Sequence, residues 1–370
     1  MAKDVIVVVQ RDALPSEKES LDILLVSTAG EYAVDTYRDV ASVEAVYGEN
    51  GACPNAKVVR KAATLFNQGK TSLADTLISK LKIVSFAEPS TPDDLIKSIQ
   101  AFQSDVDNDW YYLLTDKDDD EYITALAKFA EASEPTEAEL GAGVEDHRKF
   151  YMGQTINKKF ASDTARAAVI YADADDIDEE PDASYTGNVG PFYPTSVTWK
   201  FKRPQDGNAP TSAGTKLITL PKLTEGERSQ LLENHVNFLT EEYKRQYVKD
   251  GTCLDGEFID VVLGGDWIAK RMRDLLYDIL LENANINYDD AGFGLIATAV
   301  LQALNEAVDY NIIAVDAESK KGEFSVTIPK YSDSTEDQRR NRVMPDITWE
   351  ALLSGAIHQV KTKGVLRASL

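Results

Sequence analysis

The stretch from residue 256 to residue 294, GEFIDVVLGGDWIAKRMRDLLYDILLENANINYDDAGFG, decides the fold of the second half of the chain. Its β-branched run before Gly264 and Gly265 predicts a strand that ends in a tight glycine turn. Asp266 is a residue type that caps helix N-termini, so a long helix is expected over residues 266–283. The apolar residues of that helix recur at i, i+4 and i+7 and are Ile268, Met272, Leu275, Leu276, Ile279 and Leu280. The stretch therefore predicts a packing unit and contains no catalytic constellation.

The segments on both sides of this stretch are also predicted to form regular elements. The next helix repeats the apolar spacing with Ile296, Val300, Leu304 and Val308. Before the stretch, residues 225–243 predict a helix and residues 247–259 predict a pair of strands. Residues 324–329 and 347–353 predict two further short strands. The second half is thus predicted to be of the α+β type.

The first half alternates strands with helices, which is typical of a sheet built from βαβ units. The predicted strands are residues 21–28, 81–86, 110–114, 147–155 and 167–172, and helices are expected at residues 39–47, 57–67, from 92, and 122–132. Residues 185–210 are rich in Gly and Pro and predict a loop or linker, interrupted by a strand at residues 196–202. A domain boundary is expected near residue 195. The chain as a whole is therefore predicted to be α/β, with mixed sheets and packed helices.

Both ends of the chain carry short β-type runs that suit strand addition to the sheet of another copy. The first run could equally be a core strand of the same chain. The residues of the two runs are Val5, Ile6, Val7, Val8 and Val9 at one end, and Ile357, His358, Gln359, Val360, Val365 and Leu366 at the other. The chain is accordingly divided into an extended N-terminal arm (1–20), two domains (21–195 and 196–355) and an extended C-terminal arm (356–370).

Composition limits the classes of protein to which the chain can belong. It has 370 residues, 43% of them apolar, and a formal net charge of −23. Its length suggests about two domains, and the acidic balance disfavours direct binding to nucleic acid, which requires clustered Lys and Arg. No apolar run approaches the roughly 18 residues of a membrane span, and no signal-peptide pattern is present, so a cytoplasmic chain without membrane insertion is expected. Cys53 and Cys253 are far apart in the sequence, which fits a reducing compartment.

Residues 111–146 and 173–182 hold most of the excess negative charge. The simplest expectation is that both segments form solvated surface. The clusters at residues 116–121 and 173–180 could instead offer oxygen ligands to a divalent cation, although neither has the Gly and Glu spacing of an EF-hand.

Motifs of the common catalytic and cofactor sites are missing from the sequence. It contains no G-x-S-x-G nucleophile elbow, no P-loop and no G-x-G-x-x-G. The three histidines fall in different predicted elements without ligand spacing, and they are His147, His235 and His358. Gly264 and Gly265 before a helix could hold an anion, but Asp266 at the cap opposes this. No catalytic residue, metal or cofactor is predicted.

Two groups of basic residues stand out in this acidic chain. Lys270, Arg271 and Arg273 lie on the polar side of the predicted helix at residues 266–283. They are either ordinary solvated surface or a site that docks an acidic partner. The run RRNR at residues 339–342 could pair with acidic patches on a neighbouring copy.

The second half resembles the tail sheath proteins of contractile-tailed phages and related contractile injection machines. The matching stretches are DGEFIDVVLGGDWI (255–268), INYDDAGFGLI (286–296), FSVTIPKY (324–331), RRNRVMPDITWEALLSGAIHQV (339–360) and the closing KGVL. The first half shares a looser pattern, with LLVSTAG, AVYG and LFNQG. The resemblance covers about 130 residues well and about 300 loosely.

This resemblance implies a structural protein without enzymatic activity. In that family six copies form a ring, rings stack as a helix around an inner tail tube, and terminal arms pair as strands with a neighbour's sheet. Contraction drives the tube through a cell envelope, which in phages leads to genome ejection. The implied partners are further copies of the chain, the tail tube protein, and the baseplate and tail terminator proteins, and the implied location is a virion tail assembled in the bacterial cytoplasm.

The resemblance also implies roles for the two domains. Residues 21–195 would form an outer domain and residues 196–355 a tube-facing assembly domain, with Lys270, Arg271 and Arg273 as candidates for the tube contact. Two alternatives remain open from the sequence. One is a tail tube or other virion protein, against which the long helices argue. The other is a cytoplasmic α/β enzyme or small-molecule binding protein with dispersed site residues.

Overall fold

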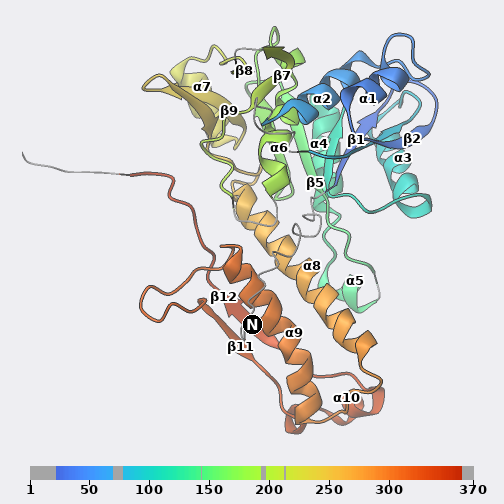
Figure 1. The fold of residues 1–370 in the computed structure, drawn as a ribbon, viewed down its shortest axis with the longest axis vertical. Helices are drawn as coiled ribbons and strands as arrows, with labels where there is room; N and C mark the ends of the chain where they lie inside the picture. Colours follow the sequence, from blue (N-terminus) through green and yellow to red (C-terminus); the bar gives the residue numbers. More distant parts are fainter. Residues whose placement is uncertain (1–21, 70–77, 143, 193–196, 212–213, 361–370) are drawn as a thin grey trace, which may run out of the picture.

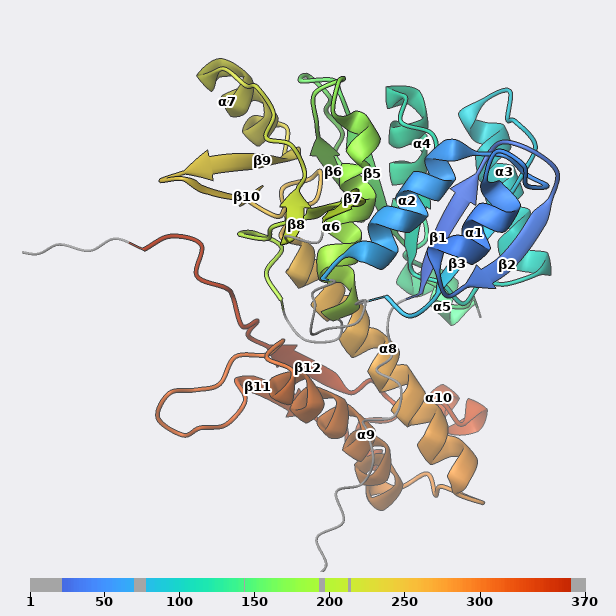
Figure 2. The same ribbon diagram turned by 45° about the horizontal axis from the view of Figure 1, so that its top comes forward.

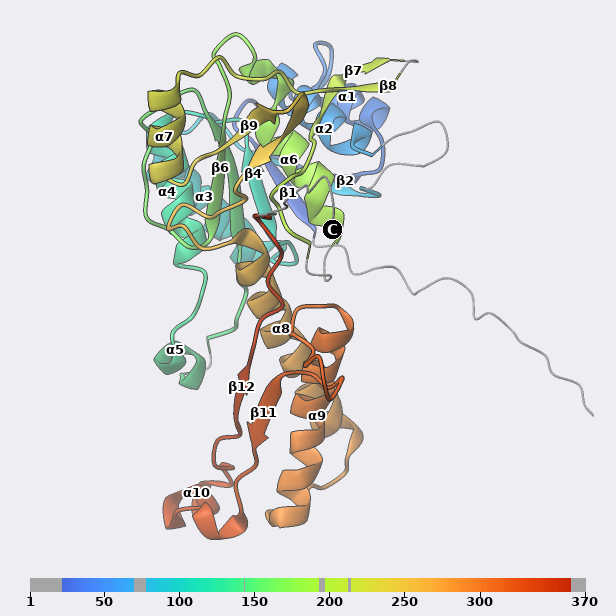
Figure 3. The same ribbon diagram turned by 90° about the vertical axis from the view of Figure 1, so that its left-hand side faces the viewer.

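The computed structural model describes residues 22–69, 78–142, 144–192, 197–211 and 214–360 (Figure 1). The predicted strand residues Val5 to Val9, Val365 and Leu366 lie outside this part of the chain. The described residues form two bodies along one long axis, and a single helix runs from the first into the second (Figures 1 and 3). We call residues 22–258 the sheet domain and residues 259–355 the C-terminal body.

An eight-stranded sheet forms the centre of the sheet domain, in the order β10-β9-β6-β5-β4-β1-β3-β2. Its strands are β1 (Ile23–Ser27), β2 (Ala33–Tyr37), β3 (Leu81–Ser85), β4 (Tyr112–Thr115), β5 (Phe150–Thr155), β6 (Ala167–Tyr171), β9 (Asn237–Glu242) and β10 (Arg245–Lys249). Neighbouring strands are parallel except for the two edge strands, β2 and β10. Every residue of β1, β4, β5 and β6 is buried, as expected for a parallel sheet that is covered on both faces. The predicted α/β class is confirmed.

Helices cover both faces of this sheet and create two separate cores. One face carries α1 (Val40–Tyr47), α2 (Ala56–Asn67) and α6 (Pro181–Val189), and the other carries α3 (Pro92–Asp105), α4 (Asp120–Glu131) and α7 (Glu225–Glu233). Asp39, Asn55 and Thr91 cap the helices that follow them, which explains where α1, α2 and α3 begin. A small hairpin of β7 (Gln205–Thr211) and β8 (Gly214–Leu217) and the short α5 (Glu137–Gly141) complete the domain, with the 3₁₀ turns Ile177–Glu179 and Gly190–Phe192.

The helix α8 (Ile259–Glu282) connects the two bodies because its two ends belong to different cores. Ile259 and Leu263 pack into the core of the sheet domain. Trp267, Ile268, Met272 and Leu275 belong instead to the core of the C-terminal body. That core also contains residues of α9 (Asp290–Asp309), β11 (Phe324–Thr327) and β12 (Thr348–Ala351). The 3₁₀ turn Tyr331–Asp333 and α10 (Glu336–Asn341) lie toward the far end, next to the beginning of α9 (Figure 1).

By length and composition alone, α9 could span a membrane. Its most apolar window is 44% buried inside the protein. Val300 and Leu304, two residues of its predicted apolar stripe, contact α8 and the hairpin as part of the same core. An apolar helix that packs in a protein core has this composition, and we interpret α9 in that way.

The strand and glycine turn predicted before Asp266 are wrong, because α8 runs without interruption from Ile259 through both glycines. Gly264 lies against Ile312, and a Cβ at this position would be 2.9 Å from Ile312 Cγ2. Tertiary packing at both ends of the helix outweighs the low helix propensity of glycine, which costs about 1 kcal/mol per residue. Asp266 is consequently a mid-helix residue and not an N-cap.

Four further predictions are wrong near the middle of the chain. The helix expected over residues 225–243 ends at Glu233, because β9 begins at Asn237 and enters the sheet beside β6. The described residues of the expected strand at 196–202 form a turn. The expected loop at 185–210 contains most of α6 and β7. The sheet also continues past the predicted boundary near residue 195, since β9 and β10 belong to it.

Candidate assembly surfaces

The hairpin of β11 and β12 has open strand edges. Phe324 pairs with Ala351, and both residues pack against the core of the C-terminal body. Within the described residues each of the two strands has one partner strand, so the other edge of each is unpaired. Such an edge can accept an extended strand from another chain, and a two-stranded sheet gains stability from added strands.

The described part of the predicted C-terminal arm leaves the body of the protein (Figures 1 and 2). Residues 356–360 form no strand, and Ile357 and Val360 are 77% and 76% exposed. Gln359 is exposed as well, whereas His358 is turned inward against the sheet domain. The pairing of these residues with a neighbouring copy stays a prediction.

The three basic residues predicted to contact a tube do not gather in one patch. Lys270 pairs with Asp274 one turn along α8, at 3.0 Å. Arg271 pairs with Glu306 on α9, through contacts of 2.5 and 3.0 Å. Arg273 reaches the loop that contains α5, where it contacts the carboxylate of Asp146 at 2.5 Å and its carbonyl oxygen at 3.0 Å. Each cation therefore has an acidic partner in the same chain, and their role toward a tube stays a prediction.

The C-terminal body exposes large apolar side chains on several elements. Leu281 at the end of α8 is 80% exposed, and Leu352 just after β12 is 58% exposed. Tyr277, Leu280, Tyr331 and Val343 are also exposed. Exposed apolar surface of this kind marks sites of protein association. All of these residues belong to the C-terminal body, which also carries the hairpin of β11 and β12.

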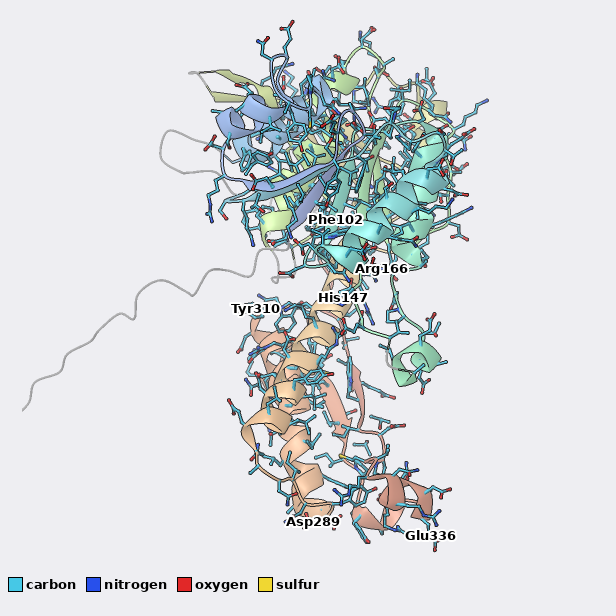
Figure 4. The ribbon with its side chains drawn as sticks, turned by 90° about the vertical axis from the view of Figure 1, so that its right-hand side faces the viewer. Phe102, His147, Arg166, Asp289, Tyr310 and Glu336 are labelled. Carbon is cyan, nitrogen blue, oxygen red and sulfur yellow. The ribbon has the colours of Figure 1, made fainter. Side chains whose placement is uncertain are left out.

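Asp266 joins the sheet domain to α8 through a buried group of charges. Its carboxylate accepts hydrogen bonds from both terminal nitrogens of Arg166, one of them at 3.1 Å, and from Arg148 at 2.9 Å. The hydroxyl of Tyr111 donates to it at 2.5 Å. Arg166 is 2% exposed and Asp266 is 6% exposed, so this contact is removed from solvent. Figure 4 places Arg166 at the lower edge of the sheet domain, where α8 leaves it.

The same group of charges extends onto the loop that carries α5. Glu134 accepts from Arg166 at 3.1 Å and lies 3.3 Å from Arg148. Asp146 accepts from the Nε of Arg148 at 3.1 Å and also binds Arg273 of α8. Removing one partner of a buried ion pair commonly costs 3–5 kcal/mol, since the remaining charge stays buried without compensation. The arrangement therefore holds α8 in a fixed orientation against the sheet.

The carboxyl ends of the parallel strands are the usual ligand site in α/β sheets of this kind. Here the described side chains at that edge bind one another. Lys61 of α2 is fully buried, pairs with Asp182, and lies 3.7 Å from Asp118 and 3.8 Å from Glu180. Burial alone would lower the pKa of Lys61, but these three carboxylates together raise it. Gln154 of β5 donates to Asp118 at 2.6 Å and to Glu180 at 3.0 Å.

The expectation that the acidic segments are solvated is wrong for this cluster. Glu180 and Asp182 are buried because Lys61 and Arg60 of α2 neutralise them. Burial raises the pKa of Glu180 to about 7, although Lys61 acts in the opposite direction. Asp116 likewise accepts hydrogen bonds from Thr28 and Asn55. The cluster fixes α2 and α6 over the sheet.

The histidines are dispersed, as the sequence predicts. His147 lies 2.7 Å from Glu145 on the surface, and His235 follows α7 with a positive φ of 55°. His358 contacts Thr198 and Phe258. Across the described ranges, no group of three His, Cys, Asp or Glu side chains is arranged to hold a metal ion.

Part of the buried junction could have been found from the sequence. Tyr111 and Arg148 lie within the first residues of two predicted strands, and Arg166 directly precedes a third. Because the amino ends of parallel strands meet at one edge of a sheet, such residues lie close together. Asp266 could not be added to this group, since it is 100 residues beyond Arg166 and was expected to cap a helix.

The whole chain aligns with solved structures of three assemblies. It matches a chain of the six-fold symmetrised anti-feeding prophage (AFP) baseplate with a TM-score of 0.66 and 13% identity, over 99% of this chain and 100% of that one. It matches a chain of the AFP helical sheath in the contracted state with a TM-score of 0.63, 13% identity and coverage of 99% and 100%. The chain shares its fold with components of contractile sheath assemblies.

A third match belongs to the sheath complex of an extracellular contractile injection system, PVC, in its contracted state. Its TM-score is 0.60 at 13% identity, over 100% of this chain and 99% of that one. No protein-family model and no curated protein matches the sequence. The predicted resemblance to tail sheath proteins is therefore confirmed at the level of the fold.

Proposed function

We propose that the chain is a non-enzymatic structural subunit that polymerises into a contractile sheath. Six copies form a ring, rings stack around a tail tube, and contraction drives that tube through a cell envelope. The observation that carries this proposal is the alignment of nearly the full length of the chain with chains of contractile sheath and baseplate assemblies. The assembly forms in the bacterial cytoplasm and belongs to a phage tail or a related injection machine.

The surfaces of the C-terminal body support this proposal. The edges of β11 and β12 that are unpaired among the described residues are suited to accept strands, and the terminal runs of the chain are suited to supply them. A chain that donates a strand at one place and accepts one at another makes a heterologous contact. Such contacts produce rings or open helical filaments, according to the rotation between copies.

The partners follow from the same arrangement. Further copies of the chain bind through the arms and the hairpin, the tail tube protein lies inside the sheath, and baseplate and tail terminator proteins bind at its two ends. We place the sheet domain on the outside and the C-terminal body, which contains most of α8, α9 and the hairpin, toward the tube. The exposed apolar residues Tyr277, Leu281 and Leu352 fit burial in such contacts.

Negative-stain electron microscopy of the purified full-length chain tests the proposal. We expect hollow cylinders whose length grows with protein concentration. Uniform small particles at every concentration would contradict it and would favour the alternative of an α/β enzyme or binding protein. Co-expression with the tail tube protein provides a second test, since a tube is expected to promote long, regular sheaths.

A further inference from the structure

The segment that follows β12 returns to the sheet domain before it leaves the protein. Figure 3 shows it running from β12 alongside α8 toward the base of the sheet. The amide of Ser354 donates to the carbonyl oxygen of Ile312 at 2.8 Å, which is the last backbone hydrogen bond of this segment in the described residues. Four residues later, His358 contacts side chains of the sheet domain. The root of the C-terminal arm therefore touches both bodies.

His358 is held by three side chains from two separate segments. Its Nε2 shares a hydrogen bond with the hydroxyl of Thr198 at 3.0 Å. Its ring meets the ring of Phe258 edge-on, with centroids 4.6 Å apart and planes at 89°, and lies 6.5 Å from the ring of Phe201. Edge-to-face pairs at these separations are favourable, and the hydrogen bond fixes the direction of the ring.

The surface that receives His358 is itself anchored. Phe201 N donates to the carbonyl oxygen of Val248, and Val248 N donates to that of Lys202, so the turn at residues 198–202 is fixed to β10. Lys200 pairs with Asp250 at 3.0 Å and lies over the ring of Phe201. A rigid turn therefore presents Thr198 and Phe201 to the arm.

The root of the arm also covers a small apolar pocket. Phe258, Asp260, Val261 and Ile312 line it, and residues 353–356 form one wall together with His358. Ile357 and Val360 on either side of His358 are more than three-quarters exposed. Among residues 356–360, only the side chain of His358 is thus turned inward. Burial and the nearby Lys200 lower the pKa of His358, and Asp260 and Asp250 act in the opposite direction.

We propose that His358 is a positioning residue that clasps the root of the C-terminal arm to the sheet domain. The arm is then held to the rest of the chain as far as His358, and not only as far as the end of β12. The direction in which the arm departs is set by the sheet domain, although the arm emerges from the C-terminal body. This deepens the proposed function, because it states which residues aim the arm at a neighbouring copy.

Electron paramagnetic resonance on the unassembled full-length chain tests the clasp without requiring a sheath. Nitroxide labels are placed at Glu241→Cys on the sheet domain and at Val360→Cys on the arm, both exposed positions. Cys53 and Cys253 are buried and remain unlabelled. We expect one narrow distance distribution. The additional change His358→Ala frees the arm beyond Ser354, so the distribution should broaden to a spread on the order of 10 Å, as for a short flexible chain.

Two variants test whether the contacts of His358, and not general disorder of the segment, determine the width of the distance distribution. Thr198→Val removes the hydrogen-bonding hydroxyl from the receiving surface and should also broaden the distribution. Gln359→Ala, an exposed neighbour, should leave it unchanged. A distribution that is already broad in the parent chain, or that stays narrow with His358→Ala, would overturn the proposal. Because the measurement uses unassembled chains, failure to form sheaths in microscopy would count against the proposed function and not against the clasp.

Discussion

The sheet domain and the C-terminal body differ in how far each is complete within one chain. In the sheet domain, helices cover both faces of the sheet, and the buried charges of Lys61 and Arg166 have partners. The C-terminal body consists of two helices, one short helix and a two-stranded hairpin whose edges have no further partner strand in the described part of the chain. It also exposes apolar residues such as Leu281 and Leu352.

This difference indicates that the two bodies have different roles in folding and in assembly. The sheet domain has the properties of a unit that folds by itself, because its buried strands and charges need no other chain. The C-terminal body leaves apolar surface and backbone groups that neighbouring copies can cover. Assembly should thus depend on the C-terminal body and the arms, and folding should depend on the sheet domain and its junction with α8.

Removal of an arm should have the largest effect on assembly and almost none on folding. Deletion of residues 1–14 or 357–370 takes away the strands that would complete a neighbour's hairpin. We expect no sheaths by negative-stain microscopy and a monomer by size-exclusion chromatography. The free energy of unfolding should change by no more than about 0.5 kcal/mol, because the proposed strand exchange stabilises contacts between copies and not the fold of one chain. Long sheaths from either truncated chain would show that strand exchange is not what connects the copies.

Asp266→Ala should have the largest effect on folding. It leaves the guanidinium groups of Arg166 and Arg148 at the junction without their shared carboxylate. We expect the free energy of unfolding to fall by about 3–5 kcal/mol, measured by urea denaturation followed by circular dichroism.

Asp274→Ala on the same helix is the matched control for this change. Asp274 pairs with Lys270 on the surface, so its loss should cost less than about 1 kcal/mol. Equal effects of the two substitutions would show that the junction does not stabilise the chain more than an ordinary surface pair does.

The same contrast explains which elements the sequence predicts. The buried strands and the capped helices of the sheet domain were predictable because their signals are local, such as Thr91 before Pro92. The start of α8 was not predictable, because contacts of Ile259 with the sheet core and of Gly264 with Ile312 decide it. The strand β9 was missed since its hairpin turns at Tyr243 and Lys244, both with positive φ, and not at a glycine or asparagine. The charge clusters join residues up to 155 positions apart, which only the fold reveals.

Glu180→Gln should change how the stability of the sheet domain depends on pH. The pKa of Glu180 is raised from 4.5 to about 7 in the folded chain, so the stability that its protonation contributes is present below pH 4.5. It is lost as the pH rises through about 7. The amide does not titrate, so relative to the parent chain the variant should become more stable as the pH rises from 4.5 to 7.

The change should amount to a few kcal/mol at most, because one pKa unit corresponds to about 1.4 kcal/mol. Urea denaturation of both chains at several pH values measures it. Glu137→Gln changes an exposed acid of α5 and is the matched control. Its free energy of unfolding should differ from that of the parent chain by the same amount at every pH. A constant difference between Glu180→Gln and the parent chain would show that Glu180 is ionised throughout this range.

Lys270→Glu should have a small effect on folding and offers the cleanest test of the predicted tube contact. Reversal of Arg271 or Arg273 would place an acid against Glu306 or Asp146, so lost assembly could then reflect a damaged fold. Lys270 is about half exposed and pairs with Asp274 within one helix, which limits the cost of reversal to roughly 1 kcal/mol. If α8 contacts an acidic surface of the tube, Lys270→Glu should reduce the fraction of sheaths that contain a tube, and Lys270→Gln should reduce it less. Counting tube-filled sheaths by microscopy distinguishes these outcomes, and an unchanged fraction with Lys270→Glu would exclude this lysine from the contact.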